Sequence, residues 1–376
     1  MTMKVLFFLQ SLDVGGIETV FLRILNGIDL SKYDVEVKFL YNYGRLLKDI
    51  PKGIKWSYIF DEKWFIRGYT HFYKLFPVKW ITKKAFRGEY DVIVSYGEGP
   101  ITSVLAAYEG QAKTISWLHR VYDKTEMKVL CGSLSKAKKL YNSFDKVICV
   151  STDVERSLRE SVPDLKKTEV VINPIDTENI KNRMQEKVDD ICFDSNCLNF
   201  ITVGRYAHQK GFVRLINIFT KLIKEGKKNI KLYIIGSGNE EKQYKKMINN
   251  YELQQNVFIV GYRENPIKYM SKADVYVCSS YWEGFSTSVM EALLANMLII
   301  TTDCGGMKDI LGFNNEYGIV VNNTDNDLYE GLKYIIDTPQ IIEEYREKAS
   351  VRAKEFDYDD LVKKIMESIE KEIAYE

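Results

Sequence analysis

The segment Asp274-Val-Tyr-Val-Cys-Ser-Ser-Tyr-Trp-Glu-Gly-Phe-Ser-Thr-Ser-Val-Met-Glu-Ala-Leu-Leu-Ala-Asn296 decides the fold. It begins with a short apolar strand, turns at Glu283-Gly-Phe, and ends in a helix whose start, Ser286 to Ser288, offers N-cap oxygens. A strand that leads through a loop into a helix N-terminus is where open α/β sheets bind nucleotides, because free backbone N–H groups and the helix dipole face an anion there. The segment therefore predicts an α/β fold with a nucleotide site at this turn.

Two glutamates flank the start of this helix, Glu283 in the loop and Glu291 within the helix. Their spacing resembles the Glu-x7-Glu signature of retaining GT-B glycosyltransferases, particularly the bacterial family 4 group. The resemblance implies that Glu283 acts in catalysis on the donor sugar hydroxyls and that Glu291 holds the ribose of the nucleotide. The spacing alone leaves a second interpretation open, in which Glu291 completes a capping box with Ser288 and Glu283 is a solvated loop acid.

The chain on both sides of this segment alternates apolar runs with helical or loop segments. We expect strands at residues 4–9, 35–40, 92–95, 114–117, 147–150, 170–172, 198–203, 231–235, 257–260, 274–278 and 298–301. This alternation predicts doubly wound parallel sheets, and a chain of 376 residues predicts two domains. We place a Rossmann-like acceptor-binding domain at 1–172, a Rossmann-like nucleotide-sugar-binding domain at 173–355, and a last helix at 356–376 that packs back on the first domain. The resemblance implies a GT-B fold, with the two domains facing each other across a cleft.

The loop Gly204-Arg-Tyr-Ala-His-Gln-Lys-Gly211 follows the first strand of the second domain. Arg205 and Lys210 can together neutralise a diphosphate, Arg by a planar fork and Lys as a point charge, although surface cations are usually solvated. The loop resembles the phosphate-binding segment of family 4 enzymes. The resemblance therefore makes Arg205 and Lys210 donor-binding residues, together with Phe285, Ser286 and Thr287 at the helix start and Tyr262 in a loop placed to contact the nucleobase.

Two features of the first domain complete the candidate site. Gly15 and Gly16 follow the first strand, where glycines let a backbone approach a ligand closely, or simply form a tight turn. His119 follows a parallel strand, and a histidine there points into the ligand-binding crevice, although a lone histidine is more often a structural hydrogen-bonder. The resemblance implies a catalytic His119 against the donor sugar, Gly16 on the donor side and Gly15 on the acceptor side.

The composition argues against several other classes of protein. Six cysteines without a C-x-x-C pair and three histidines argue against zinc ribbons, disulfide frameworks and a histidine-rich metal centre. We therefore expect neither a metal nor a cofactor. The chain has no apolar run of 18 residues and no signal peptide, which predicts a cytoplasmic protein, or one peripheral to the inner face of the cell membrane.

Charge and aromatic content point to an anionic partner of the first domain. Residues 1–172 carry a net charge of +7, from 27 Lys and Arg against 20 Asp and Glu, and the remainder carries −6. Residues 54–90 contain twelve aromatics and eight Lys or Arg but only three acids. This mixture suits an anionic membrane surface. Nucleic acid is the competing interpretation, which we do not favour, and burial of many of these rings in the core is a third.

Together these motifs resemble those of family 4 in kind and order, and the resemblance implies a retaining, metal-independent glycosyltransferase. We expect it to move a sugar from a nucleotide diphosphate donor, with a UDP-sugar favoured, to a hydroxyl of a lipid-linked or other glycan acceptor in surface polysaccharide synthesis. Two alternatives stay open: a sugar-nucleotide epimerase of similar architecture, and a non-catalytic module that binds a nucleotide sugar.

Overall fold

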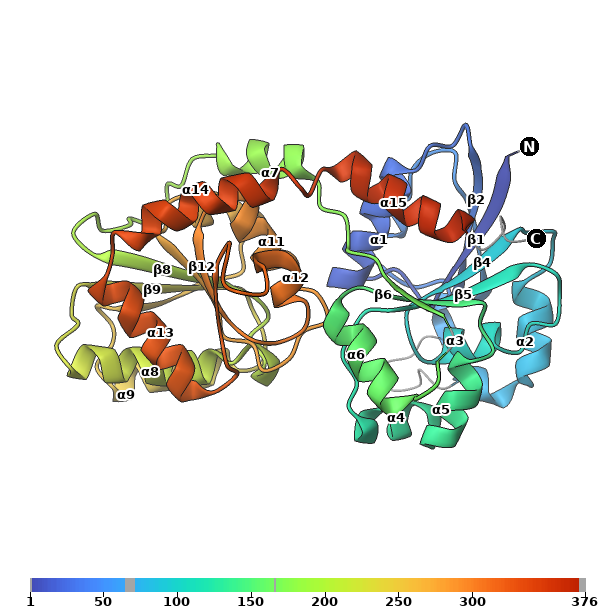
Figure 1. Ribbon diagram of the computed structural model, residues 1–376, viewed down its shortest axis with the longest axis horizontal. Helices are drawn as coiled ribbons and strands as arrows, with labels where there is room; N and C mark the ends of the chain where they lie inside the picture. The colour runs from blue at the N-terminus through green and yellow to red at the C-terminus, as the bar shows by residue number, and fades with distance from the viewer. Residues whose placement is uncertain (1, 65–71, 166, 372–376) are drawn as a thin grey trace. The chain divides into compact units, whose positions relative to one another are not determined.

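The computed structural model describes residues 2–64, 72–165 and 167–371. The chain divides into an N-terminal unit, Met1–Pro174 with Tyr358–Glu376, and a C-terminal unit, Ile175–Asp357 (Figure 1). These borders lie two residues beyond the expected ones at 172/173 and 355/356. Pro174 ends the first unit, and Asp176 caps the first helix of the second by accepting from the N–H of Asn179 at 2.9 Å.

The N-terminal unit contains one parallel sheet, seven-stranded within the described residues. From edge to edge its strands are β3 (Lys55–Phe60), β2 (Tyr33–Tyr41), β1 (Met3–Leu9), β4 (Val92–Tyr96), β5 (Lys113–Leu118), β6 (Lys146–Cys149) and β7 (Thr168–Val170). The residues from Val5 to Leu9 are all buried, because helices cover both faces of a parallel sheet.

The C-terminal unit contains a second parallel sheet, six-stranded within the described residues. Its strands are β10 (Val257–Gly261), β9 (Ile230–Ile235), β8 (Leu198–Val203), β11 (Val275–Cys278), β12 (Leu298–Thr302) and β13 (Ile319–Val321). Both sheets start at a central strand, grow to one side, and then return to grow on the other side. This order is that of a Rossmann fold and confirms the predicted fold class.

The reversal of strand order fixes where each unit can bind a ligand. In the C-terminal unit it falls between β8 and β11, which pair with Phe200 opposite Val275. In the N-terminal unit it falls between β1 and β4, which pair with Val5 opposite Val92. Ligands of open α/β sheets bind outside the carboxyl ends of the strands at this point. The loops after β8, β11, β1 and β4 are therefore the candidate site loops.

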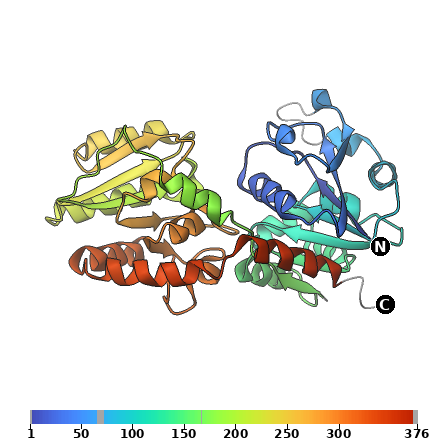
Figure 2. The ribbon, with the colours of Figure 1, turned by 90° about the horizontal axis from the view of Figure 1, so that it is seen from above.

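Helices cover the faces of both sheets (Figures 1 and 2). Those of the N-terminal unit are α1 (Gly16–Gly27), α2 (Val78–Ala85), α3 (Pro100–Leu105), α4 (Lys124–Cys131), α5 (Leu134–Tyr141), α6 (Thr152–Ser161) and α15 (Tyr358–Glu370). Those of the C-terminal unit are α7 (Thr177–Met184), α8 (Phe212–Lys224), α9 (Glu241–Asn250), α10 (Ile267–Met270), α11 (Thr287–Leu294), α12 (Met307–Leu311), α13 (Asp325–Asp337) and α14 (Ile341–Ala353). Short 3₁₀ helices occur at Leu47–Asp49, Glu62–Trp64, Phe72–Leu75 and His208–Lys210.

Helix α15 packs on the N-terminal unit, where it lies against α1. The Tyr358 hydroxyl bonds the carbonyl of Arg23, and the buried Lys146 donates to the carbonyl of Ser368 at 2.6 Å and to Glu169 at 2.8 Å. Leu361, Ile365 and Ile369 are buried beneath it, in agreement with their helical spacing.

Two strands were not foreseen from the sequence. Strand β3 lies at the sheet edge with only Ile59 and Phe60 fully buried, so its pattern does not resemble that of a core strand. Strand β13 has only three residues, which is too short for a recognisable pattern.

The aromatic and basic segment at 54–90 divides between core and surface. Residues 65–71 of this segment lie outside the described residues. Of the rest, Phe60 and Phe86 are buried in the core. Four other rings are 40–44% exposed: those of Trp56, Tyr58, Trp64 and Trp80.

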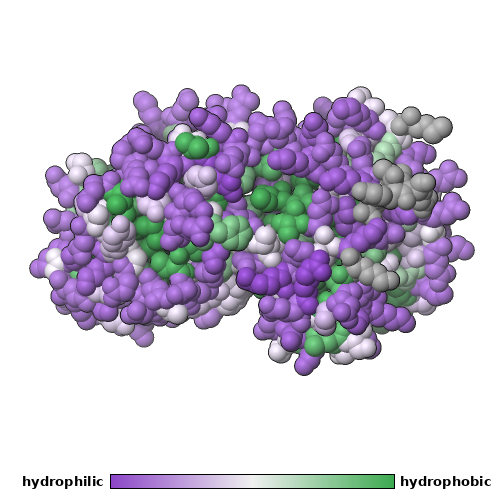
Figure 3. Space-filling view, viewed as in Figure 1, coloured by the Kyte–Doolittle hydropathy of each residue, from purple (hydrophilic) through white to green (hydrophobic). Residues whose placement is uncertain are grey.

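The face seen in Figure 3 is mostly hydrophilic, with hydrophobic residues in separate areas rather than one band. Among the described residues, the helices are all too short or too polar to cross a membrane.

Candidate functional site

The loop after β8 holds both predicted phosphate-binding cations. Arg205 has an exposed side chain, and Lys210 ends the 3₁₀ helix His208–Lys210. Gly211 follows with a φ of 65°, and a Cβ there would lie 2.0 Å from the carbonyl oxygen of Ser279. Only glycine fits this position, because the loop after β8 packs directly on the loop after β11. This contact brings Lys210 next to the second loop, where the Ser279 hydroxyl donates to the carbonyl of Lys210 at 2.8 Å.

Glu283 lies at the centre of this site, and it is only 8% exposed. Its Oε1 accepts from the Lys210 Nζ at 2.6 Å and from the Ser280 hydroxyl at 2.6 Å, and its Oε2 accepts from Gln209 at 3.5 Å. Burial is the largest single influence on Lys210 and disfavours its charged form. The charge and hydrogen bond of Glu283, with smaller contributions from Cys278 and Cys304, together exceed it and raise the pKa of Lys210 above its usual value. The interpretation of Glu283 as a solvated loop acid is therefore wrong.

Helix α11 begins after this loop, at Ser286. The Ser286 hydroxyl accepts from the N–H of Val289 at 3.4 Å, so Ser286 is the N-cap and Thr287 is the first helical residue. Glu291 is then the fifth helical residue, two positions beyond the one a capping box uses. The alternative in which Glu291 caps the helix together with Ser288 is therefore wrong. Phe285 and Thr287 are half-buried on either side of the buried Ser286.

Asn296 follows the end of helix α11. It has a φ of 54°, the left-handed conformation common at a residue that ends a helix, which asparagine tolerates better than most residues. The turn from α11 into β12 is therefore made without a glycine.

The backbone of the Glu283 loop is held by residues that the sequence did not single out. Arg214 on α8 is 2% exposed and donates to the carbonyls of Ser279 and Ser280, each at 2.8 Å. Gly305, in the loop after β12, lies so close that a Cβ there would be 1.9 Å from the carbonyl oxygen of Glu283. The role of Arg214 could not be predicted from the sequence, because Arg214 lies 65 residues before the Ser279 carbonyl that it binds.

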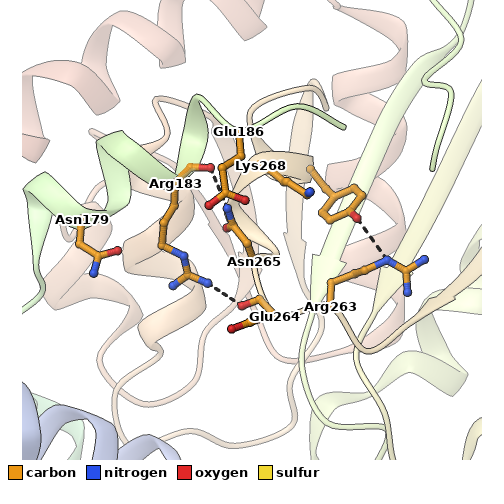
Figure 4. A pocket seen from close by; sticks show the side chains of 8 residues that line it. Asn179, Arg183, Glu186, Arg263, Glu264, Asn265 and Lys268 are labelled. Atoms are coloured by element: carbon orange, nitrogen blue, oxygen red, sulfur yellow. Dashed lines mark hydrogen bonds between the residues drawn. The ribbon is translucent and has the colours of Figure 1, made fainter. Parts of the chain in front are cut away.

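Tyr262 follows β10 in the same unit and is 69% exposed. The adjacent residues line a polar pocket of ≈620 Å³ between α7 and α10 (Figure 4). Its groups bind one another: Arg183 donates to the carbonyl of Glu264 at 2.6 Å, and Asn265 donates to the carbonyl of Arg183 at 2.8 Å. The Arg263 guanidinium donates to Asp190 at 2.9 Å. These hydrogen bonds therefore hold α7 against the loop that carries Tyr262.

In the N-terminal unit, Gly15 is the N-cap of α1 in an extended conformation that any residue can adopt. A Cβ at Gly15 would meet the Glu18 carboxylate at 2.3 Å, whereas one at Gly16 would meet nothing within 4 Å. Neither glycine is thus required by backbone strain. The open space over Gly16 is compatible with a ligand close to the backbone.

His119 follows β5 and is 6% exposed. Among the described residues neither ring nitrogen has a hydrogen-bond partner, and the ring packs against Tyr96 at 4.4 Å between centroids. Burial lowers the pKa of His119 to about 3, so the imidazole is neutral at physiological pH. A buried ring with two unused nitrogens is a better candidate for substrate contact than for a structural role.

Glu98, which follows β4, was not predicted from the sequence. Its Oε1 accepts from the backbone N–H of His119 at 2.6 Å and from that of Arg120 at 3.2 Å. Burial raises the pKa of Glu98 to about 7, and the backbone hydrogen bonds of His119 and Arg120 oppose this rise. Glu98 therefore holds the His119 loop. Its only sequence signal was its place after a strand.

The structure thus gathers Arg205, Lys210, Glu283 and the start of α11 at the carboxyl ends of β8 and β11, and it gathers Gly16, Glu98 and His119 at the corresponding ends of the first sheet. Among the residues that the structure describes, no group of three or more His, Cys, Asp or Glu side chains could hold a metal ion.

Two units with Rossmann strand order, the second carrying a cationic loop beside a buried glutamate, define a protein of the GT-B class. Residues 14–179 match the family Glycosyltransferase Family 4, and residues 185–356 match Glycosyl transferases group 1. The chain therefore contains a Glycosyltransferase Family 4 domain followed by a Glycosyl transferases group 1 domain.

Individual relatives agree with these two domain matches. An N-acetylgalactosamine-N,N'-diacetylbacillosaminyl-diphospho-undecaprenol 4-alpha-N-acetylgalactosaminyltransferase of Campylobacter jejuni is 31% identical over 51% of this chain and 50% of its own length. The match thus spans about half of that relative. The amylovoran biosynthesis glycosyltransferase AmsD of Erwinia amylovora is 26% identical over 68% of this chain and 72% of its own length. The crystal structure of Anabaena HepE in complex with UDP matches 98% of this chain and 100% of its own, with a TM-score of 0.76 at 18% identity, and shows the same fold.

Proposed function

We propose that the protein is a retaining glycosyltransferase that moves a sugar from a nucleoside diphosphate donor to an acceptor hydroxyl. The observation that carries this proposal is the placement of Lys210 at 2.6 Å from the buried Glu283, at the carboxyl ends of β8 and β11. A cation there suits a diphosphate, and a carboxylate beside it suits the hydroxyls of the attached sugar.

In the proposed reaction, the bond from the sugar C1 to the diphosphate oxygen breaks, and a bond from C1 to the acceptor oxygen forms on the same face. The acceptor proton passes to the leaving diphosphate. Arg205, Lys210 and the N-terminus of α11 stabilise the charge that develops on this leaving group, without a metal ion. Glu283 and His119 contact the sugar, and Glu291 binds the ribose.

A UDP-sugar is the favoured donor, because HepE, which has the same fold, was crystallised with UDP. A lipid-linked glycan is the favoured acceptor. The Campylobacter jejuni relative is named for a diphospho-undecaprenol acceptor, and AmsD is named for the biosynthesis of a polysaccharide. Both assignments extend to this chain only as proposals.

The exposed surface around α2 supports a membrane location for the acceptor. We define the α2 patch as Leu75, Val78, Lys79, Trp80, Lys83 and Arg87, all of which are exposed. Rings and aliphatic side chains of this kind enter the headgroup region, and the cations attract anionic lipid. We propose that this patch docks the protein on an anionic membrane that carries the acceptor.

Incubation with radiolabelled UDP-sugars tests the function, with and without polyprenyl-diphosphate-linked glycans, in parallel samples that contain either EDTA or Mg²⁺. We expect label to be transferred to the lipid. NMR of the product should show an α linkage when the donor is α-linked, as a retaining enzyme requires. Epimerised donor would support an epimerase, and an unchanged donor that still binds would support a binding module. Transfer that requires a divalent cation would overturn the metal-independent mechanism.

A further inference from the structure

Side chains bind the main-chain carbonyls of the four loop residues that directly precede Glu283. Four successive carbonyls accept hydrogen bonds from side chains. Ser279 and Ser280 are bound by Arg214 at 2.8 Å each, Tyr281 by Asn323 at 2.7 Å, and Trp282 by Gln209 at 2.9 Å. Backbone carbonyls in an ordinary loop are satisfied largely by water. This loop is therefore fixed in one conformation up to the residue next to Glu283.

Arg214 joins three loops at once. Besides the two carbonyls of the loop after β11, its guanidinium donates to the Thr302 hydroxyl at the end of β12, at 3.2 Å. It also donates to the Asn323 side chain after β13, at 2.9 Å. Asn323 and Thr302 bind the same loop in turn, because Thr302 donates to the carbonyl of Ser280 at 2.7 Å. The planar guanidinium, which also lies over the Tyr281 ring at 4.1 Å, is the common centre of this network.

Such a buried cation is energetically unfavourable by itself. Arg214 is 2% exposed, and its ion pair with Asp325 is long, at 3.8 Å, with the Asp325 side chain 67% exposed. Burial accordingly lowers the pKa of Arg214. Neutral carbonyls compensate only part of the cost of burying a charge, and apolar replacements of buried ion networks are often as stable. An arginine at this position therefore adds little to the stability of the fold. Its hydrogen bonds to the loop carbonyls explain its presence better.

We propose that Arg214 is a positioning residue that fixes the backbone from Ser279 to Tyr281, the last of these through Asn323, so that Glu283 meets the donor sugar in its productive orientation. This inference rests on the proposed transferase function. It assigns Arg214 no contact with the substrate. Its effect is expected on the chemical step, because a carboxylate displaced by about 1 Å can lower a rate by about 100-fold.

The test compares Arg214→Met with Arg352→Met. Arg352 is a matched control in the same unit: it also donates to two main-chain carbonyls, those of Ile310 at 3.0 Å and Asp309 at 2.7 Å, but these lie on α12. We expect Arg214→Met to lower kcat by about 10- to 100-fold and to change the Kd for UDP by less than about 3-fold. Arg352→Met should keep kcat within about 2-fold, even where it lowers the Tm equally.

Arg214→Lys separates charge from geometry, because lysine keeps the positive charge but lacks the planar fork. We expect it to restore less than half of the lost kcat. Full restoration would mean that charge alone matters and would overturn the proposal, as would a folded Arg214→Met protein with unchanged kcat. Should Arg214→Met fail to fold, Asn323→Ala, which frees the carbonyl of Tyr281, takes its place with the same expected loss of kcat.

A measurement without substrate keeps this inference separate from the proposed function. Trp282 lies next to Glu283 and is 41% exposed, and its ¹⁹F resonance in 5-fluorotryptophan-labelled protein can be assigned with Trp282→Phe. Arg214→Met should shift or broaden this resonance, and Arg352→Met should not. An unchanged Trp282 resonance would overturn the role of Arg214. Absence of any sugar transfer by the wild type would instead overturn the proposed function and leave this result standing.

Discussion

Lys210 and Glu283 bind each other directly, with the Lys210 Nζ 2.6 Å from the Glu283 Oε1. The side chains are 16% and 9% exposed, so water screens this pair only weakly. A diphosphate that binds Lys210 must share its ammonium with Glu283 and must tolerate the nearby carboxylate. The residue proposed to act on the sugar therefore also weakens the binding of the diphosphate.

Glu283→Gln should consequently separate binding from transfer. Loss of the carboxylate charge frees the Lys210 ammonium only in part, because the Gln amide oxygen can still accept from it. We therefore expect the Kd for UDP to fall by about 3- to 10-fold, which is less than the effect of one full charge-assisted hydrogen bond. The rate of sugar transfer should fall as well, because the sugar hydroxyls lose their acceptor. Calorimetry of UDP binding and initial rates measure the two effects. Asp194→Asn, which breaks the remote Lys231–Asp194 pair of 2.9 Å, serves as a control, and weaker UDP binding by Glu283→Gln would contradict the argument.

Removal of either cation proposed to bind the diphosphate should weaken the nucleotide complex. We expect Arg205→Ala and Lys210→Ala each to raise the Kd for UDP by about 10- to 150-fold, since a charge-assisted hydrogen bond contributes about 1.5 to 3 kcal/mol. Lys210→Ala should have the smaller effect, because the wild-type ammonium is partly engaged by Glu283. Titration calorimetry at fixed ionic strength gives both constants. Unchanged affinity in both variants would remove the diphosphate assignment.

Glu291→Gln tests the proposed contact of Glu291 with the ribose. Helix capping does not explain a glutamate at this position, because the N-cap of α11 is Ser286. We expect weaker UDP binding with little change in the rate at saturating donor. The decisive comparison uses 2′-deoxy- and 3′-deoxy-UDP: removal of the bound hydroxyl should weaken binding to the wild type more than to Glu291→Gln. Equal losses in the two proteins would show that Glu291 does not contact the ribose.

The α2 patch should bind anionic vesicles. Co-sedimentation with phosphatidylglycerol-containing liposomes should fall as salt rises, and it should weaken on changing Lys79, Lys83 and Arg87 to Glu, since each cation contributes about 1 kcal/mol. Lys84 is left unchanged, because its ammonium donates to the carbonyl of Ile59 at 3.0 Å and supports the fold. Charge reversal at the exposed Lys245 of the other unit, which pairs with Glu241 on α9, is the control. Wild-type protein that ignores anionic vesicles at low salt would favour a soluble acceptor.

The pH dependence of stability should reveal Glu98. Its pKa of about 7 lies above the usual value near 4.5, so the folded protein holds this proton more tightly than the unfolded chain does. Ionisation of Glu98 therefore lowers the free energy of unfolding. This loss of stability develops as the pH rises from about 4.5 to 7 and is complete above pH 7. Relative to the wild type, Glu98→Gln should gain stability across this window. Thermal unfolding of both proteins at pH 5 and pH 8 measures this gain, and a difference that does not depend on pH would contradict the raised pKa.

Much of this architecture could be predicted from local patterns. Continuous apolar runs such as residues 4–9 identify parallel strands because both faces are buried, and glycine loops such as 204–211 identify the turns at their carboxyl ends. The edge strand β3 was missed because four of its six residues are not buried, and its exposed rings were assigned to a surface instead.

The site was predictable only where a motif is contiguous. Glu283, Lys210 and the start of α11 lie in recognisable loops, but the ion pair between Glu283 and Lys210 spans 73 residues and follows from strand order alone. Arg214 and Glu98 were not found, since each acts on a backbone that is distant in sequence. An arginine within an amphipathic helix reads as a solvent-facing residue until the loops around it are known.

Helix α15 belongs to the N-terminal unit but is synthesised after the C-terminal unit, which sets the order in which the two units can fold during translation. Lys146 is buried, and one of its acceptors is the carbonyl of Ser368, which is synthesised 222 residues later. The second sheet can thus fold during translation before α15 is made, whereas the first unit gains this helix and its bond to Lys146 only after residue 368 has been synthesised. A nascent chain stalled before residue 358 would expose the surface of α1 that this helix covers, and chaperones that bind apolar segments would be expected to recognise it there.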